Sequence, residues 1–197
     1  MKTTTTIAAL ICGFMIYSCN SDEHTKEATL EKVNEPKTML KADPVVRGAY
    51  LVNTNGCNDC HSPKVMTENG VEVDESRMLS GHPANEKLAP YDEATAKSYI
   101  LFSPGLTAAT GPWGTSFAAN LTPHETGLGT WTEGQFLTAI RKGLYKGIEG
   151  SRPLLPPMPW QHYRNFTDDD LKAIFAYLQS LNPVDNIVPE PIPPKVQ

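Results

Sequence analysis

The chain has 197 residues, a formal net charge of −5 and 40% hydrophobic residues. This length supplies one globular domain with a core of its own and is short for two domains. The mild acidity argues against a nucleic-acid partner, because neutralising phosphates requires clustered lysine and arginine side chains. The 17 prolines, many of them in the last third, predict a loop-rich domain with an extended tail.

The first 18 residues have the features of an export signal. An apolar run, Ile7–Tyr17, follows a positively charged start and ends at a small residue, Ser18, before Cys19. The run is shorter than the about 20 apolar residues that span a bilayer, so it fits a signal peptide over residues 1–18. The four residues that end at Cys19 resemble a bacterial lipobox, which predicts a lipoprotein with Cys19 as its lipid anchor.

Two alternatives to the lipoprotein reading remain: cleavage by an ordinary signal peptidase, and an uncleaved membrane anchor. Each of the three places the domain outside the cytoplasm, on the periplasmic or cell-envelope side. After the anchor, residues 19–42 are polar and predict a flexible tether.

The folded domain is predicted to begin at Asp43, an N-cap residue followed by a proline that suits the first helical position. Apolar residues then recur at helical spacing until Asn55-Gly56, where the helix is predicted to stop. We assign the domain to residues 43–188 and a proline-rich tail, as a strap or a loose end, to residues 189–197.

Cys57-Asn58-Asp59-Cys60-His61 is the motif that carries chemistry. A Cys-x-x-Cys-His run is the attachment signature of c-type haem, in which two thiols bond one porphyrin and the histidine binds its iron. A zinc site would need two further ligands at similar spacing, and the chain has no second cysteine pair. A redox disulfide would need a strand-to-helix context, whereas this motif is predicted to end a short helix. The sequence therefore predicts one haem, attached at Cys57 and Cys60, with His61 as an iron ligand.

The second axial position decides the function, and seven other residues are candidates for it. The candidates are Met39, Met66, Met78, Met158, His82, His124 and His162. Met39 falls in the tether, and Met66 precedes Asn69-Gly70, a predicted hairpin turn. His82 and His124 lie next to prolines in polar loops, where solvated side chains are expected.

Met158 is the favoured ligand because prolines at 156, 157 and 159 fix its backbone and remove local N–H donors. Such a rigid apolar loop can hold a thioether against iron. The alternative is that Met158 only fills a gap in the core.

These motifs, in this order and followed by a closing helix, resemble class I cytochrome c. The runs Asn120-Leu121-Thr122-Pro123, Thr126-Gly127-Leu128-Gly129-x-Trp131 and Pro157-Met158-Pro159-Trp160 look like those in cytochrome c subunits of bacterial membrane-bound dehydrogenases. The resemblance implies a mainly α-helical fold of about four or five helices around one haem, with His61 and Met158 as axial ligands. This chain departs from those subunits by having one haem motif, and from compact members by a longer separation of the two ligands. We assign the extra length to loops and a hairpin within residues 63–120.

Two further helices are marked by their caps. Thr132 and Gln135 match a capping box, and Thr167 precedes three aspartates at the positive end of the last helix. Phe136, Leu137, Ile140 and Leu144 are predicted to line one face of the earlier helix. In class I domains the last helix packs across the first.

Supporting roles are predicted for five side chains. Arg141 and Arg152 are each a candidate partner for a haem propionate or a solvated surface arginine. Trp113, Trp160 and Tyr163 are expected to line the haem pocket.

The function expected from these features is single-electron transfer rather than enzymatic turnover. The expected donor is a periplasmic dehydrogenase, and the expected acceptor is a membrane oxidase or another cytochrome. Two alternatives stay open. A haem enzyme or small-ligand sensor would have a labile sixth ligand, and a fixed haem subunit would stay bound to one dehydrogenase.

Overall fold

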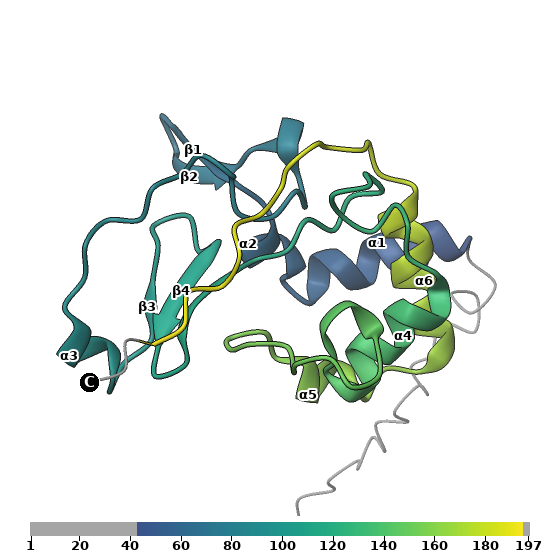
Figure 1. Cartoon of the computed structure of the whole chain (residues 1–197). Coiled ribbons are helices and arrows are strands. Elements are labelled where there is room, and N and C mark those ends of the chain that lie inside the picture. The colour runs from purple at the N-terminus through teal and green to yellow at the C-terminus, as the bar shows by residue number, and fades with distance from the viewer. Residues whose placement is uncertain (1–42, 195–197) are drawn as a thin grey trace, which may run out of the picture. The chain divides into compact units, whose positions relative to one another are not determined.

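The computed structural model describes residues 43–194 (Figure 1). Six α-helices are α1 (Pro44–Thr54), α2 (Cys57–His61), α3 (Glu93–Ala96), α4 (Glu133–Lys142), α5 (Trp160–Tyr163) and α6 (Asp168–Gln179). Five short strands are β1 (Lys64–Thr67), β2 (Gly70–Val73), β3 (Leu101–Phe102), β4 (Ala108–Gly111) and β5 (Gly114–Phe117). Two 3₁₀ turns are η2 (Glu75–Arg77) and η3 (Tyr145–Gly147). The predicted signal peptide, Cys19, the tether and Met39 lie outside the described residues.

Helix α1 begins as predicted, since the Asp43 side chain accepts a hydrogen bond from the backbone N–H of Val45 at 2.9 Å. It ends before Gly56, whose φ of +68° breaks the helical path. The stop predicted at Asn55-Gly56 is therefore confirmed, and the cysteine motif forms a separate helix, α2, rather than only ending a short one. The Lys64 ammonium donates to three carbonyls at the end of α2, those of Asn58, Asp59 and Ser62.

The caps of α4 and α6 are confirmed. Thr132 and Gln135 form the reciprocal capping box of α4, and the Thr167 hydroxyl accepts from the N–H of Asp170 at the start of α6. Helix α4 ends at Lys142 because Gly143 takes a φ of +65°. Leu144 therefore lies beyond the helix to which the apolar spacing assigned it.

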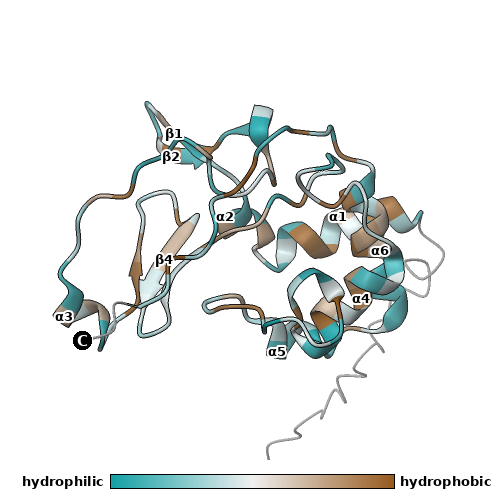
Figure 2. Ribbon diagram, in the orientation of Figure 1, coloured by the Kyte–Doolittle hydropathy of each residue, from teal (hydrophilic) through white to brown (hydrophobic). Residues whose placement is uncertain are grey.

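The core lies where α1, α4 and α6 meet, and Figure 2 shows hydrophobic residues on all three helices. Helices α1 and α6 cross closely, as the resemblance implied, and Gly48 of α1 lies against the backbone of Ala173 in α6. The buried core residues are Leu51, Val52, Leu79, Leu128, Phe136, Ile140, Leu171, Ile174 and Leu178. Burial of these side chains supplies the main driving force for folding.

Residues 63–120 contain the predicted hairpin and an additional sheet. Strands β1 and β2 pair antiparallel, with Thr67 opposite Gly70. The two-residue turn is therefore Glu68-Asn69, one residue before the predicted Asn69-Gly70. Strands β3, β4 and β5 form a second antiparallel sheet in that order, which the sequence pattern did not predict. The mainly helical class is confirmed, with these strands added to it.

The chain after α6 is an extended segment that returns across the molecule to β5 (Figure 1). Its Ile192 exchanges two backbone hydrogen bonds with Thr115, at 2.7 and 2.9 Å. We call residues 183–194 the strap. None of the described helices combines the length and the apolar character that crossing a bilayer requires.

Candidate functional site

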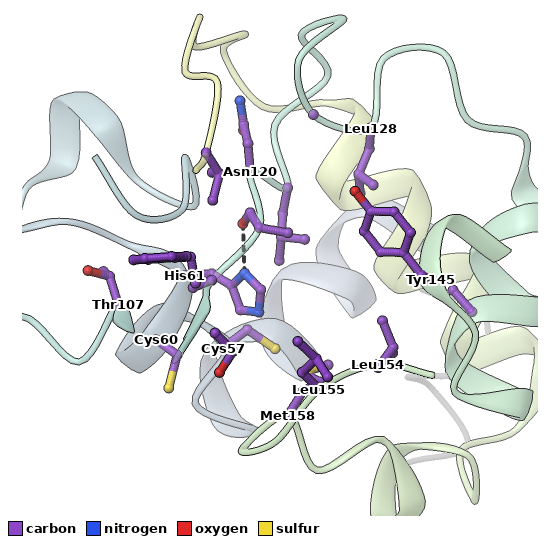
Figure 3. A pocket seen from close by; sticks show the side chains of 18 of the residues that line it. Cys57, Cys60, His61, Thr107, Asn120, Leu128, Tyr145, Leu154, Leu155 and Met158 are labelled. Atoms are coloured by element: carbon purple, nitrogen blue, oxygen red, sulfur yellow. Dashed lines mark hydrogen bonds between the residues drawn. The ribbon is translucent and has the colours of Figure 1, made fainter. Parts of the chain in front are cut away.

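A cavity of about 520 Å³ lies beside α2 and contains the predicted site residues (Figure 3). Its volume falls within the about 300–1,000 Å³ of cofactor pockets. Most of its lining is apolar and comes from α1, α4, α6, the β4–β5 hairpin and the strap. Cys57, Cys60, His61 and Met158 all line it, so residues that are far apart in sequence meet at one place.

Cys57 and Cys60 are three residues apart on α2, and within the described residues both thiols are free. Burial raises the pKa of Cys57 to about 11 and also raises the pKa of Cys60.

His61 donates through Nδ1 to the backbone carbonyl of Ala119 at 2.8 Å, the dashed line of Figure 3. A carbonyl only accepts, so Nδ1 carries the ring proton. Burial lowers the pKa of His61, which keeps the ring neutral. Nε2 therefore keeps a free lone pair, the form in which imidazole binds iron.

Met158 lies in a loop between η3 and α5 that is fixed at several points. The N–H of Leu154 donates to the carbonyl of Gly143 at 2.7 Å, and the Ser116 hydroxyl of β5 donates to the carbonyl of Pro156 at 2.5 Å. Met158 packs against the hydrophobic core and lines the cavity to which His61 also contributes (Figure 3). The structure thus brings the favoured pair of ligands to one space.

The other described candidates for the second ligand do not line the cavity. Met66 is 77% exposed on β1, and Met78 packs against the core. His162 is exposed on α5, while His124 is partly buried and bonds Thr126 through Nδ1 at 2.9 Å. His82 is fully buried, so the expectation of a solvated loop side chain was wrong for it.

The two arginines considered as propionate partners differ in position. Arg141 pairs with Asp168, the first residue of α6, and donates to the carbonyl of Arg164 at the end of α5. Arg152 lines the cavity and stacks over the ring of Tyr145, with Cζ 3.9 Å from the ring centroid. Tyr145 also lines the cavity, and its hydroxyl makes no hydrogen bond to the described residues.

Of the three aromatic side chains expected to line the pocket, only Tyr163 does so, and its hydroxyl donates to the carbonyl of Asn55 at 3.0 Å. Trp113 instead bonds Ser116 within the β4–β5 hairpin, and Trp160 packs against Gly143. Trp131 and Tyr145 also line the cavity. Trp131 closes the family-like run that begins at Thr126, but no pocket role was predicted for it, and Tyr145 was not predicted at all.

The cavity fits a covalently attached haem on four observations. Two free thiols lie on one helix, the walls are mostly apolar, and a neutral imidazole and a thioether line the same space. Arg152 and Tyr145 add donors suited to carboxylates. Each of these groups matches a part of the haem: vinyl groups, ring faces, iron and propionates.

The sequence profile of the family described as Cytochrome c matches residues 45–182 of this chain. The gluconate 2-dehydrogenase cytochrome c subunit of Pantoea cypripedii is 27% identical over 193 residues, covering 94% of this chain and 32% of that subunit. The cytochrome c subunit of the quinone alcohol dehydrogenase of Gluconobacter oxydans is 36% identical over 142 residues, 71% of this chain and 22% of that subunit.

The fructose dehydrogenase cytochrome subunit of Gluconobacter japonicus is 37% identical over 86 residues, 43% of this chain and 17% of that subunit. The chain thus spans a third or less of the length of each of these relatives. The family match extends over both thiols, over α2 to α6 and over nearly all of α1, and so covers the cavity walls except for the strap. The chain therefore belongs to the cytochrome c family, in which c-type haem is bound covalently through a cysteine pair such as Cys57 and Cys60.

Proposed function

We propose that this chain is a single-electron carrier with His61 and Met158 as the two axial ligands of its haem. The observation that carries the proposal is that the two side chains line one cavity, which also holds both thiols. When bound, a c-type haem supplies one-electron transfer between ferric and ferrous iron.

His61 contributes the lone pair of Nε2, and its Nδ1–H bond to Ala119 fixes the orientation of the ring. Met158 contributes a thioether, which favours ferrous iron and raises the reduction potential relative to a second imidazole. With His61 and Met158 both holding the iron, small molecules would have no position at which to bind it. This arrangement favours electron transfer over turnover of a substrate at iron.

The apolar walls would keep water from the bound cofactor, and Arg152 with Tyr145 would pair with its propionates. Arg141 has no such role in this proposal, because it is paired with Asp168.

We propose a dehydrogenase as the electron donor, because the relatives are named as dehydrogenase subunits. The acceptor is a membrane oxidase or another cytochrome. Residues 1–18 act as the signal peptide, the lipid on Cys19 anchors the protein to a membrane outside the cytoplasm, and residues 19–42 form the tether. Mass spectrometry of the protein from the membrane fraction tests the lipid anchor, which requires acyl groups on Cys19. The anchor also requires that the Cys19→Ser variant is released from the membrane.

The relatives' names also favour a second candidate, a haem subunit that stays bound to one dehydrogenase. Purification of the full chain from its native membrane distinguishes the two. A stoichiometric dehydrogenase that survives high salt indicates a fixed subunit, and a chain that purifies alone yet accepts electrons indicates a mobile carrier.

A further inference from the structure

The segment Leu79–His82 lies buried between two other parts of the chain. Leu79, Ser80 and His82 are each at most 1% exposed. On one side the segment runs antiparallel to Ala118–Leu121: the N–H of His82 donates to Ala118 at 2.9 Å, and the N–H of Leu121 donates to Leu79 at 2.8 Å.

On its other side the segment is held by the strap. The Asn186 amide donates to the carbonyls of Ser80 and His82, at 2.7 and 2.9 Å. We call Leu79–His82, Ala118–Leu121 and Asn186 together the clamp. These backbone and amide hydrogen bonds fix the three segments relative to one another.

The clamp is connected directly to the proposed iron ligand. The N–H of Gly81 donates to the backbone carbonyl of His61 at 2.7 Å. A β-carbon on Gly81 would lie 2.6 Å from both the oxygen of Ala118 and the carbonyl carbon of Ala119. The carbonyl that accepts the His61 Nδ1–H bond therefore belongs to a backbone packed tightly against this segment.

His82 closes a ring of three hydrogen bonds behind this backbone. Its N–H donates to Ala118, the N–H of Ala118 donates to the carbonyl of Thr107 at 2.8 Å, and the Thr107 hydroxyl bonds His82 Nδ1 at 2.8 Å. The imidazole also packs on Phe117, with ring centroids 4.8 Å apart. Thr107 also lines the cavity (Figure 3), whereas His82 lies outside the cavity lining.

The other ring nitrogen of His82, Nε2, is buried and makes no hydrogen bond of normal geometry to the described residues. A buried unpaired nitrogen is unfavourable. The contribution of this imidazole therefore comes from Nδ1 and from its packing on Phe117, which lines the cavity.

We propose that His82 is a positioning residue for His61. With Thr107 it fixes the Ala118–Ala119 backbone, so that the Ala119 carbonyl keeps its hydrogen bond to the proposed ligand. The inference rests on the proposed function, in which His61 binds the iron. An acceptor at Nδ1 makes the imidazole more basic and stabilises ferric iron, so loosening the clamp raises the reduction potential.

The test uses the full-length, haem-loaded chain in four variants: His82→Leu, His82→Asn, Thr107→Val and Thr107→Ser. His82→Leu removes Nδ1, whereas His82→Asn places an amide near the same position. Two readouts are measured: the midpoint potential, and the exchange rate of the His61 Nδ1–H with solvent by NMR. His82→Leu is expected to raise the potential and speed exchange several-fold, and His82→Asn is expected to restore most of both.

Thr107→Val should speed exchange like His82→Leu, and Thr107→Ser should behave as the wild type. Because both changes act through one hydrogen bond, the double variant should speed exchange less than the two single effects combined. Asp170→Asn is the control for lost stability, since it breaks the ion pair with Arg47 outside the clamp. It should move neither readout.

Wild-type potential and exchange in His82→Leu, with only a lower unfolding midpoint, would overturn the inference. If His82→Leu fails to accumulate, Thr107→Val provides the test. Exchange of the His61 Nδ1–H at the wild-type rate in Thr107→Val would also overturn the proposal. Failure of the proposed function would be seen in a different measurement. The unmutated protein would then lack a low-spin spectrum or an iron-bound histidine.

Discussion

A β-carbon on Gly48 would lie 2.0 Å from the carbonyl oxygen of Ala173, so α1 and α6 cross with their backbones in contact. Gly48→Ala must push the helices apart, and overpacking of this kind costs about 1–3 kcal/mol or more. We predict a loss of at least this size in the free energy of unfolding of the haem-loaded protein, measured by denaturant titration.

Gly134 is the matched control, because its added β-carbon would meet only the Thr132 hydroxyl at 4.0 Å. Gly134→Ala lies in the exposed first turn of α4 and should be neutral or stabilising by up to about 1 kcal/mol. Equal destabilisation by both substitutions would contradict the importance of the crossing.

Arg152 and Arg141 give a matched pair for the charge near the haem. Arg152→Gln removes a positive charge from the cavity wall, which disfavours the reduced state and lowers the midpoint potential. A unit charge acting over about 10 Å at an effective dielectric of about 20 is worth about 1.7 kcal/mol, or about 70 mV for one electron. The expected shift is therefore tens of millivolts, measured by spectroelectrochemistry.

Arg141→Gln should leave the potential unchanged and cost less than about 1 kcal/mol of stability, because it breaks only a surface ion pair with Asp168. A potential that responds equally to both substitutions would show that Arg152 has no specific role toward the propionates.

Met158→Ala should convert the protein to a high-spin form that binds carbon monoxide. It removes the proposed thioether and truncates a side chain packed on the core, with an expected stability loss of about 2–5 kcal/mol. Optical spectra of the reduced protein with carbon monoxide measure the first effect. Met66→Ala, at a 77% exposed position, should change neither the spectrum nor the stability. A Met158→Ala protein that stays low-spin and excludes carbon monoxide would show that Met158 is not an iron ligand.

His82 should make stability depend on pH. Burial lowers its pKa below the ordinary value of about 6.5, and the charge of Glu86, the facing ionisable group, opposes the shift only in part. As the pH falls below about 6.5, the unfolded chain takes up a proton that the folded chain does not, so stability falls. The unfolding midpoint should drop more in the wild type than in His82→Asn between about pH 7.5 and about pH 5.5. Equal drops would show that His82 titrates alike in both states.

The three long helices, α1, α4 and α6, and the attachment site were predictable because their signals are local. Asp43, Thr132 and Thr167 cap helices through bonds to backbone groups two or three residues away, and the cysteine pair is contained in one short motif. Met158 could be singled out as a candidate ligand because its proline neighbours restrict the backbone within a few residues.

The remaining features depend on contacts between distant segments. Trp113 and Trp160 were expected in the pocket by residue type, but neighbouring packing turns both to other partners. The burial of His82 depends on Thr107 and on Asn186, 104 residues away. No local pattern around His82-Pro83 predicts a pairing at that distance.

The central claim, iron held by His61 and Met158 in an electron carrier, is tested most directly by the optical spectrum of the full-length, haem-loaded protein. The spectrum is recorded oxidised and reduced, and again after carbon monoxide is added to the reduced form. We predict a low-spin spectrum with the weak thioether-to-ferric-iron band, unchanged by carbon monoxide. A high-spin spectrum, or ready binding of carbon monoxide, would contradict the claim and indicate an open site of the kind found in a haem enzyme or a sensor.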